Sequence, residues 1–380
     1  MTTNFQIENT KISFSIDDLS SDNLLIQSMP YSYEVSFVNE TALKNELEEI
    51  RINNKDKHFV FIDQSVADFY GDSIFKDLEM LKLTALEDNK VLPVATTVLD
   101  KLQEKNITKK EIFLSAGGGI TQDLSAFARA VYKRGINWFY MPTTLLAMAD
   151  SCIGAKSCLN YGGVKNQLGL FSAPHKVFIF SGFLKTLPTR DVLSGYGEII
   201  KLVIVGGNTA IAEFERLVDE QDNDKLKNIN QLIMLSLLIK KSVIEIDEFE
   251  TDIRKALNYG HTVGHAIEPL VNYAIPHGIA VSIGMYIENI IASEYGTLPK
   301  YQAEHLNTLI KPFIDRESIQ HLYDISLQDI ISNMKRDKKA LSDDVYMAVP
   351  MQIGIFDILK ISVDGKFEKF LGDALKELSN

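Results

Sequence analysis

The chain has 380 residues, of which 46% are hydrophobic and 24% are charged, values that are ordinary for a globular protein. This length exceeds what one hydrophobic core usually spans, so we expect two domains. The formal net charge of −12 argues against nucleic acid or an acidic membrane surface as a partner. No apolar run approaches the roughly 18 residues that a membrane span needs.

The N-terminal stretch MTTNFQIENTKISFSIDD lacks the basic and apolar regions of a secretory signal. Only two cysteines occur, Cys152 and Cys158, and both fall in what reads as an active-site loop. Reduced thiols in a cytoplasmic protein are therefore the simplest interpretation.

The first half of the chain predicts alternating strands and helices. Residues 1–35 favour short strands or a hairpin. Apolar stretches then predict four strands, the first ending at Asp63, and helical patterns follow the first three; these elements fall in the segments 58–70, 80–106, 111–132 and 138–146. Alternation at this spacing is typical of a Rossmann-like parallel sheet.

The hydrophobic pattern changes near Arg190. The segments that follow show the 3.6-residue period of helices. Clear strand alternation returns only at 345–354. The Leu187-Pro188 pair marks the expected boundary, so the fold class is α/β with a Rossmann-like domain over 1–188 and an α-helical domain over 189–380. The sequence contains no internal repeat and no low-complexity segment.

A glycine triplet, Gly117 to Gly119, follows an apolar strand and opens a helix that carries Asp123. Glycine lets a backbone approach a pyrophosphate, and the helix N-terminus supplies N–H donors. Two further pairs fall at the same expected edge of the sheet, where ribose hydroxyls and phosphates lie in a doubly wound fold: Glu87 and Lys90, and Thr143 and Thr144. Together they favour a dinucleotide site over a plain tight turn.

The segment DSCIGAKSCLNYGGVKN, residues 150–166, places Lys156, Asn160, Lys165 and Asn166 in a glycine-containing loop beyond a strand end. Lysine there can bind a phosphate as a point charge, and asparagine adds neutral donors. A solvated loop is the alternative, but lysine beside glycine at a sheet edge favours an anion pocket.

Three of the seven histidines fall within seventeen positions: His261, His265 and His277. His261 and His265 are four apart, so they share a helix face. Such a pair alone is more often structural than metal-binding. Thr262 stands where a zinc protease needs glutamate, which makes a protease unlikely.

An otherwise apolar helical segment carries Glu198 and Lys201. A carboxylate in such surroundings needs a partner, and a metal ion is a good one. Glu198 with His261 and His277 would complete a three-ligand site. Lys240 and the pair Lys338-Lys339 add positive charge, although each alone would read as surface.

These pieces together resemble the sugar phosphate cyclase family, and within it most closely the 3-dehydroquinate synthases. The resemblance covers roughly residues 58–355 and is carried by motifs in family order, among them GGGITQD, YKRG, PTTLLAMADSCIGAK, VKNQLG, GYGEIIK, RKALNYGHTVGHAIE, HGIAVSIGM and MKRDKK. It implies a homodimer that binds NAD on an α/β domain and zinc or cobalt between this domain and a helical one.

The resemblance also implies roles by position. The metal ligands would be Glu198, His261 and His277, with His265 as a neighbouring proton-handling group. The cofactor residues would be Glu87, Lys90, Gly118, Gly119, Asp123, Thr143, Thr144, Lys165, Phe183 and Thr186. The substrate residues would be Asp150, Lys156, Asn166, Lys201, Lys240, Arg254, Asn258 and either Lys338 or Lys339. Arg134 would reach a substrate phosphate across the dimer.

Members of this family cyclise different sugar phosphates, and the residue at the position of Arg254 distinguishes these substrate classes. With Lys240 it matches the positions that hold a substrate carboxylate, and relatives acting on neutral sugar phosphates tend to lose it and to carry an acidic residue at Asn258. We therefore expect phosphate elimination and ring closure of a seven-carbon 3-deoxy-sugar acid phosphate, with NAD used catalytically.

Three departures from the family pattern leave room for a divergent specialist: Gln122 and Ala155 in place of glycines, and Ile279 in place of an acidic residue. The alternatives are an amino-dehydroquinate, 2-deoxy-scyllo-inosose or 2-epi-5-epi-valiolone synthase. A metal-dependent polyol dehydrogenase shares the architecture, but an uncharged polyol has no use for so many cations. A non-catalytic descendant would lack a metal ligand, and all three are present.

Overall fold

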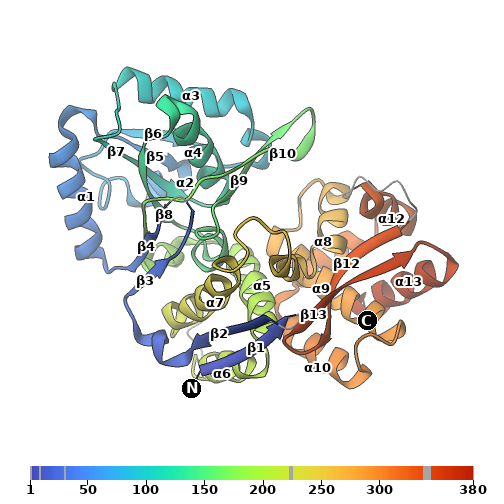
Figure 1. The fold of residues 1–380 in the computed structure, drawn as a ribbon. Helices are drawn as coiled ribbons and strands as arrows, with labels where there is room; N and C mark the ends of the chain where they lie inside the picture. The colour runs from blue at the N-terminus through green and yellow to red at the C-terminus, as the bar shows by residue number, and fades with distance from the viewer. Residues whose placement is uncertain (1, 8–9, 30, 222–225, 337–343, 380) are drawn as a thin grey trace. The chain divides into compact units, whose positions relative to one another are not determined.

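The computed structural model describes residues 2–7, 10–29, 31–221, 226–336 and 344–379. The chain divides into two compact units. We call residues 20–187 the sheet unit, and residues 1–19 together with 188–380 the helical unit (Figure 1).

A seven-stranded sheet forms the core of the sheet unit, in the order β3-β4-β11-β8-β7-β5-β6. Only the edge pair β3–β4 is antiparallel, and the other neighbours are parallel. The strands are β3 (Asn23–Ile26), β4 (Tyr33–Phe37), β5 (Val60–Asp63), β6 (Met80–Leu83), β7 (Ile112–Gly117), β8 (Asn137–Pro142) and β11 (Lys176–Ile179). The predicted parallel sheet is confirmed, and its central strands are buried on both faces, as parallel strands usually are.

Three helices of this unit follow its strands as the alternation predicted: α2 (Gln64–Tyr70), α3 (Leu92–Glu104) and α4 (Gly119–Val131). Helix α1 (Glu40–Asn54), which follows β4, was not predicted. Helix α4 begins directly after β7, at the predicted glycine turn. Its N-cap is Gly118, which offers no side-chain cap to the first N–H groups of the helix.

A two-stranded hairpin, β9 (Lys156–Tyr161) and β10 (Val164–Phe171), stands where the sequence predicted a loop. Most side chains of β10 are exposed or half-buried, so its sequence lacks the alternation that marks a strand with one buried face. The hairpin matters because it carries Lys156, Lys165 and Asn166.

The helical unit is built around α9 (His277–Glu294), whose side chains from Gly278 to Asn289 are all buried. Helices α5, α8, α10 and α13 contact it. The other helices are α5 (Thr189–Gly206), α6 (Asn208–Asp219), α7 (Ile229–Ile244), α8 (His261–Ile267), α10 (Lys300–Ile310), α11 (Arg316–Leu322), α12 (Leu327–Arg336) and α13 (Gly365–Ser379).

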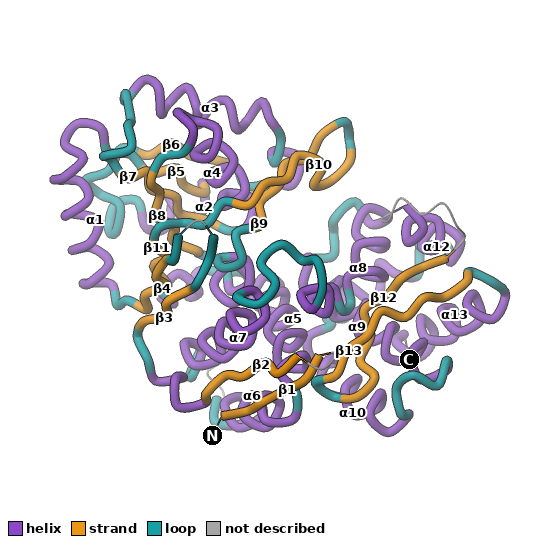
Figure 2. The backbone as a smooth tube through the Cα atoms, in the orientation of Figure 1, coloured by secondary structure: helices purple, strands orange, loops and turns teal. Residues whose placement is uncertain are grey.

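Two hairpins belong to the helical unit, β1 (Thr2–Ile7) with β2 (Thr10–Ser15), and β12 (Asp344–Gln352) with β13 (Ile355–Ser362). Strand β2 lies beside α7, and β1 contacts β13 (Figure 2). The first nineteen residues therefore pack with the helical unit, which differs from the range 1–188 expected for the sheet domain. No local pattern reveals this, because it depends on contacts between chain ends far apart in sequence.

Among the described residues, no helix is both long enough and apolar enough to cross a membrane.

Candidate active site

Three helices of the helical unit bring together Glu198, His261 and His277. Glu198 lies in the middle of α5, His261 opens α8, and His277 opens α9. Glycines let α5 and α9 approach closely, since a Cβ on Gly197 would lie 2.1 Å from the carbonyl oxygen of Gly278. We call Glu198, His261, His265 and His277 the histidine cluster.

The ligand atoms of this cluster converge. Oε1 of Glu198 lies 3.3 Å from Nε2 of His277 and 3.8 Å from Nε2 of His261. A single ion could thus contact all three side chains after small side-chain adjustments. The donor set of one carboxylate and two imidazoles suits zinc or cobalt, and leaves positions open for a substrate.

Glu198 is 1% exposed, and neither of its carboxylate oxygens has a hydrogen bond from any described residue. Lys201 forms an ion pair with it, but without hydrogen-bond geometry. Burial alone would raise the pKa of Glu198, whereas Lys201 and the two histidines hold that pKa well below its usual range. A buried, ionised carboxylate without hydrogen bonds is costly. A bound cation would satisfy it, so these residues fit a divalent metal.

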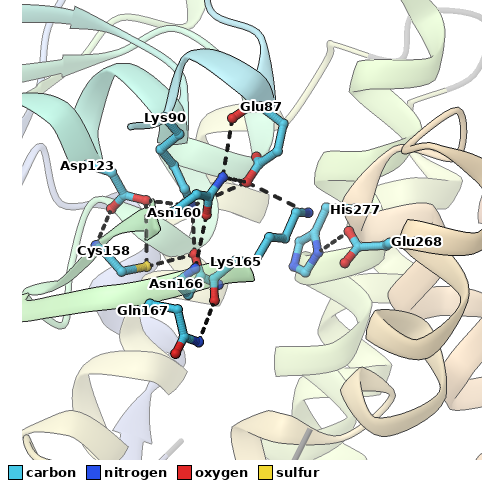
Figure 3. Close-up of polar contacts among 10 residues, drawn as sticks. All are labelled: Glu87, Lys90, Asp123, Cys158, Asn160, Lys165, Asn166, Gln167, Glu268 and His277. Atoms are coloured by element: carbon cyan, nitrogen blue, oxygen red, sulfur yellow. Dashed lines mark hydrogen bonds and ion pairs between the residues drawn. The ribbon is translucent and has the colours of Figure 1, made fainter. Parts of the chain in front are cut away.

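The two imidazoles differ in their surroundings. Burial, reinforced by Lys201, lowers the pKa of His261 well below its usual value, which keeps the ring neutral as a ligand must be. His277 Nδ1 lies 3.0 Å from Oε1 of the buried Glu268 (Figure 3). Although burial opposes it, the carboxylates of Glu268 and Glu198 raise the pKa of His277 to about 10. The Glu268 contact orients the ring so that Nε2 faces Glu198.

His265 belongs to the same cluster. Its ring centroid lies 5.0 Å from that of His261 and 5.5 Å from that of His277. One ligand atom from each of the three histidines lies within 4.8 Å of the others, so the histidines alone also form a metal-competent set. The structure thus brings together every histidine that the sequence singled out, and both ligand assignments fit its geometry.

Three predicted substrate residues that carry positive charge are buried in the helical unit. Lys201 is 3% exposed, Lys240 on α7 is 6% exposed, and Arg254 is 3% exposed. The side-chain amide of Asn258 donates to Oε1 of Glu250 at 2.7 Å. Because buried lysine and arginine are rare unless paired, three of them in one unit indicate an anionic ligand or a charged network.

In the sheet unit, the glycine turn is shaped by close contacts. A Cβ on Gly117 would lie 2.4 Å from Thr121 Oγ1, and one on Gly118 would lie 3.1 Å from Thr144 Cγ2. A Cβ on Gly119 would meet nothing within 4 Å, so the space beside the helix N-terminus is open. The N–H of Thr143 donates to the carbonyl of Gly117 and joins the ends of β7 and β8.

A hydrogen-bonded network links three of the ten predicted cofactor residues, Glu87, Lys90 and Asp123, with two asparagines of the hairpin (Figure 3). Lys90 Nζ lies 3.1 Å from Asp123 Oδ2 and donates to Asn166 Oδ1 at 2.8 Å. Asn160 donates to Glu87 Oε1 at 2.8 Å and accepts from the N–H of Asn166 at 2.9 Å. We call Glu87, Lys90, Asp123, Asn160 and Asn166 the cofactor network.

Two neighbours complete this network. Lys165 Nζ lies 3.8 Å from Glu87 Oε1. Although burial would lower the pKa of Lys90, Asp123, Cys158 and Glu87 raise it, so Lys90 stays charged. Burial raises the pKa of the Cys158 thiol to about 12, which makes it a hydrogen-bonding neighbour and not a nucleophile.

Gln122, one of the departures from the family pattern, bridges two elements. Its Nε2 donates to the carbonyl of Ser151 and its Oε1 accepts from the Ser151 hydroxyl, both at 2.6 Å. Ser151 ends a π-helical turn, Ala147–Ser151, that carries the half-buried Asp150. Gln122 therefore ties the first turn of α4 to the segment of a predicted substrate residue.

Ala155, a second departure, has a φ of 60° and follows Gly154 with a φ of 95°. Glycine adopts this region without strain, and alanine does not. The turn leads into β9, where Lys156 is exposed. The third departure, Ile279, is fully buried in α9, where an apolar side chain suits its surroundings.

Phe183 and Thr186 lie in the turn before the helical unit. The Phe183 ring is 2% exposed and packs against Tyr70, Phe75 and Phe180. These aromatic side chains therefore enclose the Phe183 ring. The hydroxyl of Thr186 donates to the Phe183 carbonyl at 3.2 Å.

Arg134 is exposed in a turn where Lys133, Arg134 and Gly135 all have positive φ. It makes no hydrogen bond or ion pair with any residue that the structure describes. Lys338 and Lys339 lie outside the described residues.

Sequence reasoning missed Glu268 and the central place of Asn160. Glu268 follows His265 by three residues, so helical spacing could have placed it beside the histidines. Asn160 was predicted as a neutral donor in the anion pocket and not as a cofactor residue, because only the hairpin brings it to Glu87.

Two family models match consecutive parts of the chain. Residues 80–194 match the model described as 3-dehydroquinate synthase N-terminal, and residues 195–340 match the one described as 3-dehydroquinate synthase C-terminal. The junction between them falls within α5.

Relatives span nearly the whole chain. A 3-dehydroquinate synthase of Prochlorococcus marinus (strain MIT 9312) is 33% identical over 356 residues, which cover 89% of this chain and 96% of the relative. A crystal structure of 2-deoxy-scyllo-inosose synthase with carbaglucose-6-phosphate, NAD+ and Co2+ aligns with a TM-score of 0.76 at 22% identity, covering 93% of this chain and 99% of that one.

A third match is the 2-epi-5-epi-valiolone synthase of Streptomyces hygroscopicus subsp. jinggangensis 5008 with NAD+ and Zn2+ bound, with a TM-score of 0.72 at 21% identity and coverage of 93% and 98%. At this identity the two solved structures establish a shared fold, whereas the sequence relative and the two family models identify the lineage. The chain belongs to the 3-dehydroquinate synthase family.

Proposed function

We propose that this protein catalyses the reaction of its family, the conversion of 3-deoxy-D-arabino-heptulosonate 7-phosphate to 3-dehydroquinate and phosphate, with catalytic NAD and a divalent metal. The reaction eliminates phosphate and closes a carbocycle without net redox change. The protein is therefore a phosphate-eliminating lyase.

One observation carries this proposal. A metal-competent cluster with a buried carboxylate, Glu198, occurs in the same unit as buried Lys201, Lys240 and Arg254. A metal site alone would equally suit a dehydrogenase for an uncharged alcohol. The buried cations favour an anionic substrate, and an arginine fork fits a carboxylate.

The metal would be held by Glu198, His261 and His277. When bound, NAD supplies a reversible hydride acceptor and the metal supplies a Lewis acid toward a ring hydroxyl. Glu268 holds the His277 ring through Nδ1, so Nε2 would face the metal and would give up its proton when the metal binds. His265, beside both rings, can hold or accept a proton at its own ring nitrogen.

The cofactor would lie on the sheet unit. The N–H groups at the start of α4, uncapped by any side chain, would bind the pyrophosphate. Glu87 would accept hydrogen bonds from ribose hydroxyls, and Asn160 and Lys165 fix its position. The remaining predicted cofactor residues are Thr143, Thr144, Phe183 and Thr186.

Arg254 and Lys240 would bind the substrate carboxylate, while Asn258, Asp150 and Asn166 would hold ring hydroxyls. Lys156 and one of Lys338 or Lys339 would bind the phosphate. We further propose a cytoplasmic homodimer in which Arg134 reaches the phosphate bound by the other subunit. Arg134 is exposed and pairs with none of the residues that the structure describes, which supports this arrangement.

The test is phosphate release by purified protein with NAD and Co2+ or Zn2+. Three substrates are compared: 3-deoxy-D-arabino-heptulosonate 7-phosphate, glucose 6-phosphate and sedoheptulose 7-phosphate. We expect release from the acid alone, without net accumulation of NADH.

Release from a neutral sugar phosphate would keep the chemistry of a cyclase and refute the substrate. Steady NADH accumulation with a polyol, and no phosphate from any of the three, would identify a dehydrogenase instead.

A further inference from the structure

A buried carboxylate outside the histidine cluster gathers the backbone that leads to Arg254. Asp247 follows α7 and is 7% exposed. Its Oδ1 accepts from the N–H of Thr251 at 2.8 Å and from the Thr251 hydroxyl at 3.1 Å. Its Oδ2 accepts from the N–H of Asp252 at 2.8 Å and of Arg254 at 3.0 Å. We call residues 247–254 the anchor loop.

The anchor loop holds Arg254 at two points. Asp247 accepts from its backbone N–H, and the carbonyl of Glu248 accepts from its guanidinium group. The loop thus closes on itself around one arginine, which is 3% exposed. A guanidinium fixed in this way has lost most of its rotamer freedom before any ligand arrives.

The same loop reaches a second predicted substrate residue. The side-chain amide of Asn258 donates to Glu250 Oε1 at 2.7 Å. Glu250 has a φ of 60°, a backbone conformation that a non-glycine residue keeps only when its surroundings impose it. The three backbone N–H groups held by Asp247 all follow Glu250, and Asp247 precedes it, so the loop between them is positioned to impose this conformation.

The charge of Asp247 is what makes the anchor strong. Burial would raise the pKa of Asp247, but the N–H groups of Thr251, Asp252 and Arg254 lower it below its usual value. The carboxylate is therefore ionised, and hydrogen bonds to an ionised acceptor are stronger than neutral ones.

We propose that Asp247 is a positioning residue that sets the preference for an acid substrate by fixing Arg254 through the anchor loop. This inference rests on the proposed function, in which Arg254 binds the substrate carboxylate. Asp247 itself has both oxygens occupied by the loop, so it acts through Arg254 and does not contact the substrate.

The first variant is Asp247→Asn, which keeps the shape and removes the charge and one acceptor. We expect KM for the acid substrate to rise about 10- to 100-fold while kcat changes less than about threefold, because uniform binding is lost. In an Arg254→Ala background the same change should raise KM no further, because the residue that it positions is already gone.

A matched control is Asp315→Asn. Asp315 also accepts from a backbone N–H and a hydroxyl, those of Ser318, at 2.8 and 2.9 Å, and it caps α11. The Asp315→Asn variant should lower the stability of the protein and leave KM for the acid substrate unchanged. Should Asp247→Asn not fold, Thr251→Val removes one donor to Asp247 and should raise KM about threefold in the same direction.

Hydrogen exchange separates the anchor from the substrate assignment. In Asp247→Asn the amides of Thr251, Asp252 and Arg254 should exchange faster than in the wild type, without substrate present. Wild-type protection of these amides, an unchanged KM, or a KM increase that adds fully to that of Arg254→Ala would overturn the proposal.

Should the wild type use only a neutral sugar phosphate, the proposed function is wrong and Asp247 sets no acid preference. The hydrogen exchange result would still decide whether Asp247 holds Arg254.

Discussion

The two functional regions of this molecule treat their buried carboxylates differently. In the cofactor network, Glu87 and Asp123 are each met by hydrogen-bonding or charged neighbours from the hairpin and from Lys90. In the histidine cluster, Glu198 is more deeply buried and receives no hydrogen bond from a described residue. Glu198 does have Lys201 as an ion partner, so the difference lies in its missing hydrogen bonds, which a bound cation would replace.

This contrast teaches what each region contributes. The cofactor network is a preorganised frame, in which protein groups hold one another in place before the cofactor binds. In the histidine cluster, the ionised carboxylate of Glu198 is available to bind a cation. Variants in the two regions should therefore fail in different ways.

Glu198→Gln should produce the largest effect. The change removes a ligand charge and leaves Lys201 buried without its ion partner. We expect phosphate release to fall on the order of 10³-fold, since an electrostatic contribution at the reacting centre is lost. Steady-state assays at saturating NAD measure this.

Glu111→Gln is the control for that variant. Glu111 is a carboxylate of the sheet unit that accepts from Thr108 and pairs with Lys57. Its loss should lower stability with little effect on kcat. Equal losses of activity in Glu198→Gln and Glu111→Gln would contradict the claim that the two regions differ in function.

Asn160→Ala should weaken NAD binding about tenfold, because Glu87 and Asn166 both lose a partner in the frame. Equilibrium titration of NAD measures it. Gln167→Ala, which removes only a contact to the Lys165 carbonyl in the same hairpin, is the matched control and should bind NAD normally. Unchanged affinity in Asn160→Ala would mean that the network does not position the cofactor.

The sheet unit should also lose stability in mild acid through His175. Burial, then the charge of Arg129, lowers the pKa of His175 to about 4. The unfolded chain has a pKa near 6.5, so it takes up a proton first as the pH falls. Stability is complete above pH 6.5 and declines toward pH 4.

Because His175 is only half-buried, screening reduces the effect to on the order of 1 kcal/mol between pH 7 and pH 5. Urea unfolding at several pH values measures it, and His175→Gln should flatten the difference across this window. A pH dependence identical in the two proteins would refute the assignment.

Ala155→Gly should have the smallest effect. Relief of the positive φ at this position favours the variant, while the greater freedom of glycine in the unfolded chain opposes it. We expect a net stabilisation of about 0.5 kcal/mol, the remainder of these opposing contributions. Thermal unfolding tests it, and a destabilised variant would show that the buried alanine methyl group matters more than the strain.

Much of this architecture could be predicted because its signals are local. The apolar run, glycine turn and helix from Ile112 to Val131 predicted β7 and α4, and the spacing of His261 and His265 predicted their shared face. His277 could also be assigned to the site despite its distance in sequence, because proline and glycine mark the turn in which it lies.

What could not be predicted depends on long-range closure. The hairpin β9–β10 exposes most of its side chains, so its alternation is weak, and Asn160 reaches Glu87 only once the hairpin forms. The first nineteen residues join the helical unit through β2 and α7, a contact with no sequence signal. In the sequence, Asp247 is only an acidic residue after a helix. Its role depends on hydrogen bonds that form when the anchor loop folds back on it.

Metal binding without substrate tests the central claim most directly. Metal-free protein is titrated with Co2+ and followed by thermal unfolding, alongside Glu198→Gln. A ligand that binds only the folded state stabilises it by about 4 kcal/mol at a thousandfold excess over Kd. We predict a large rise in Tm for the wild type and little for the variant. Equal rises in both proteins would contradict the assignment of Glu198 as a metal ligand.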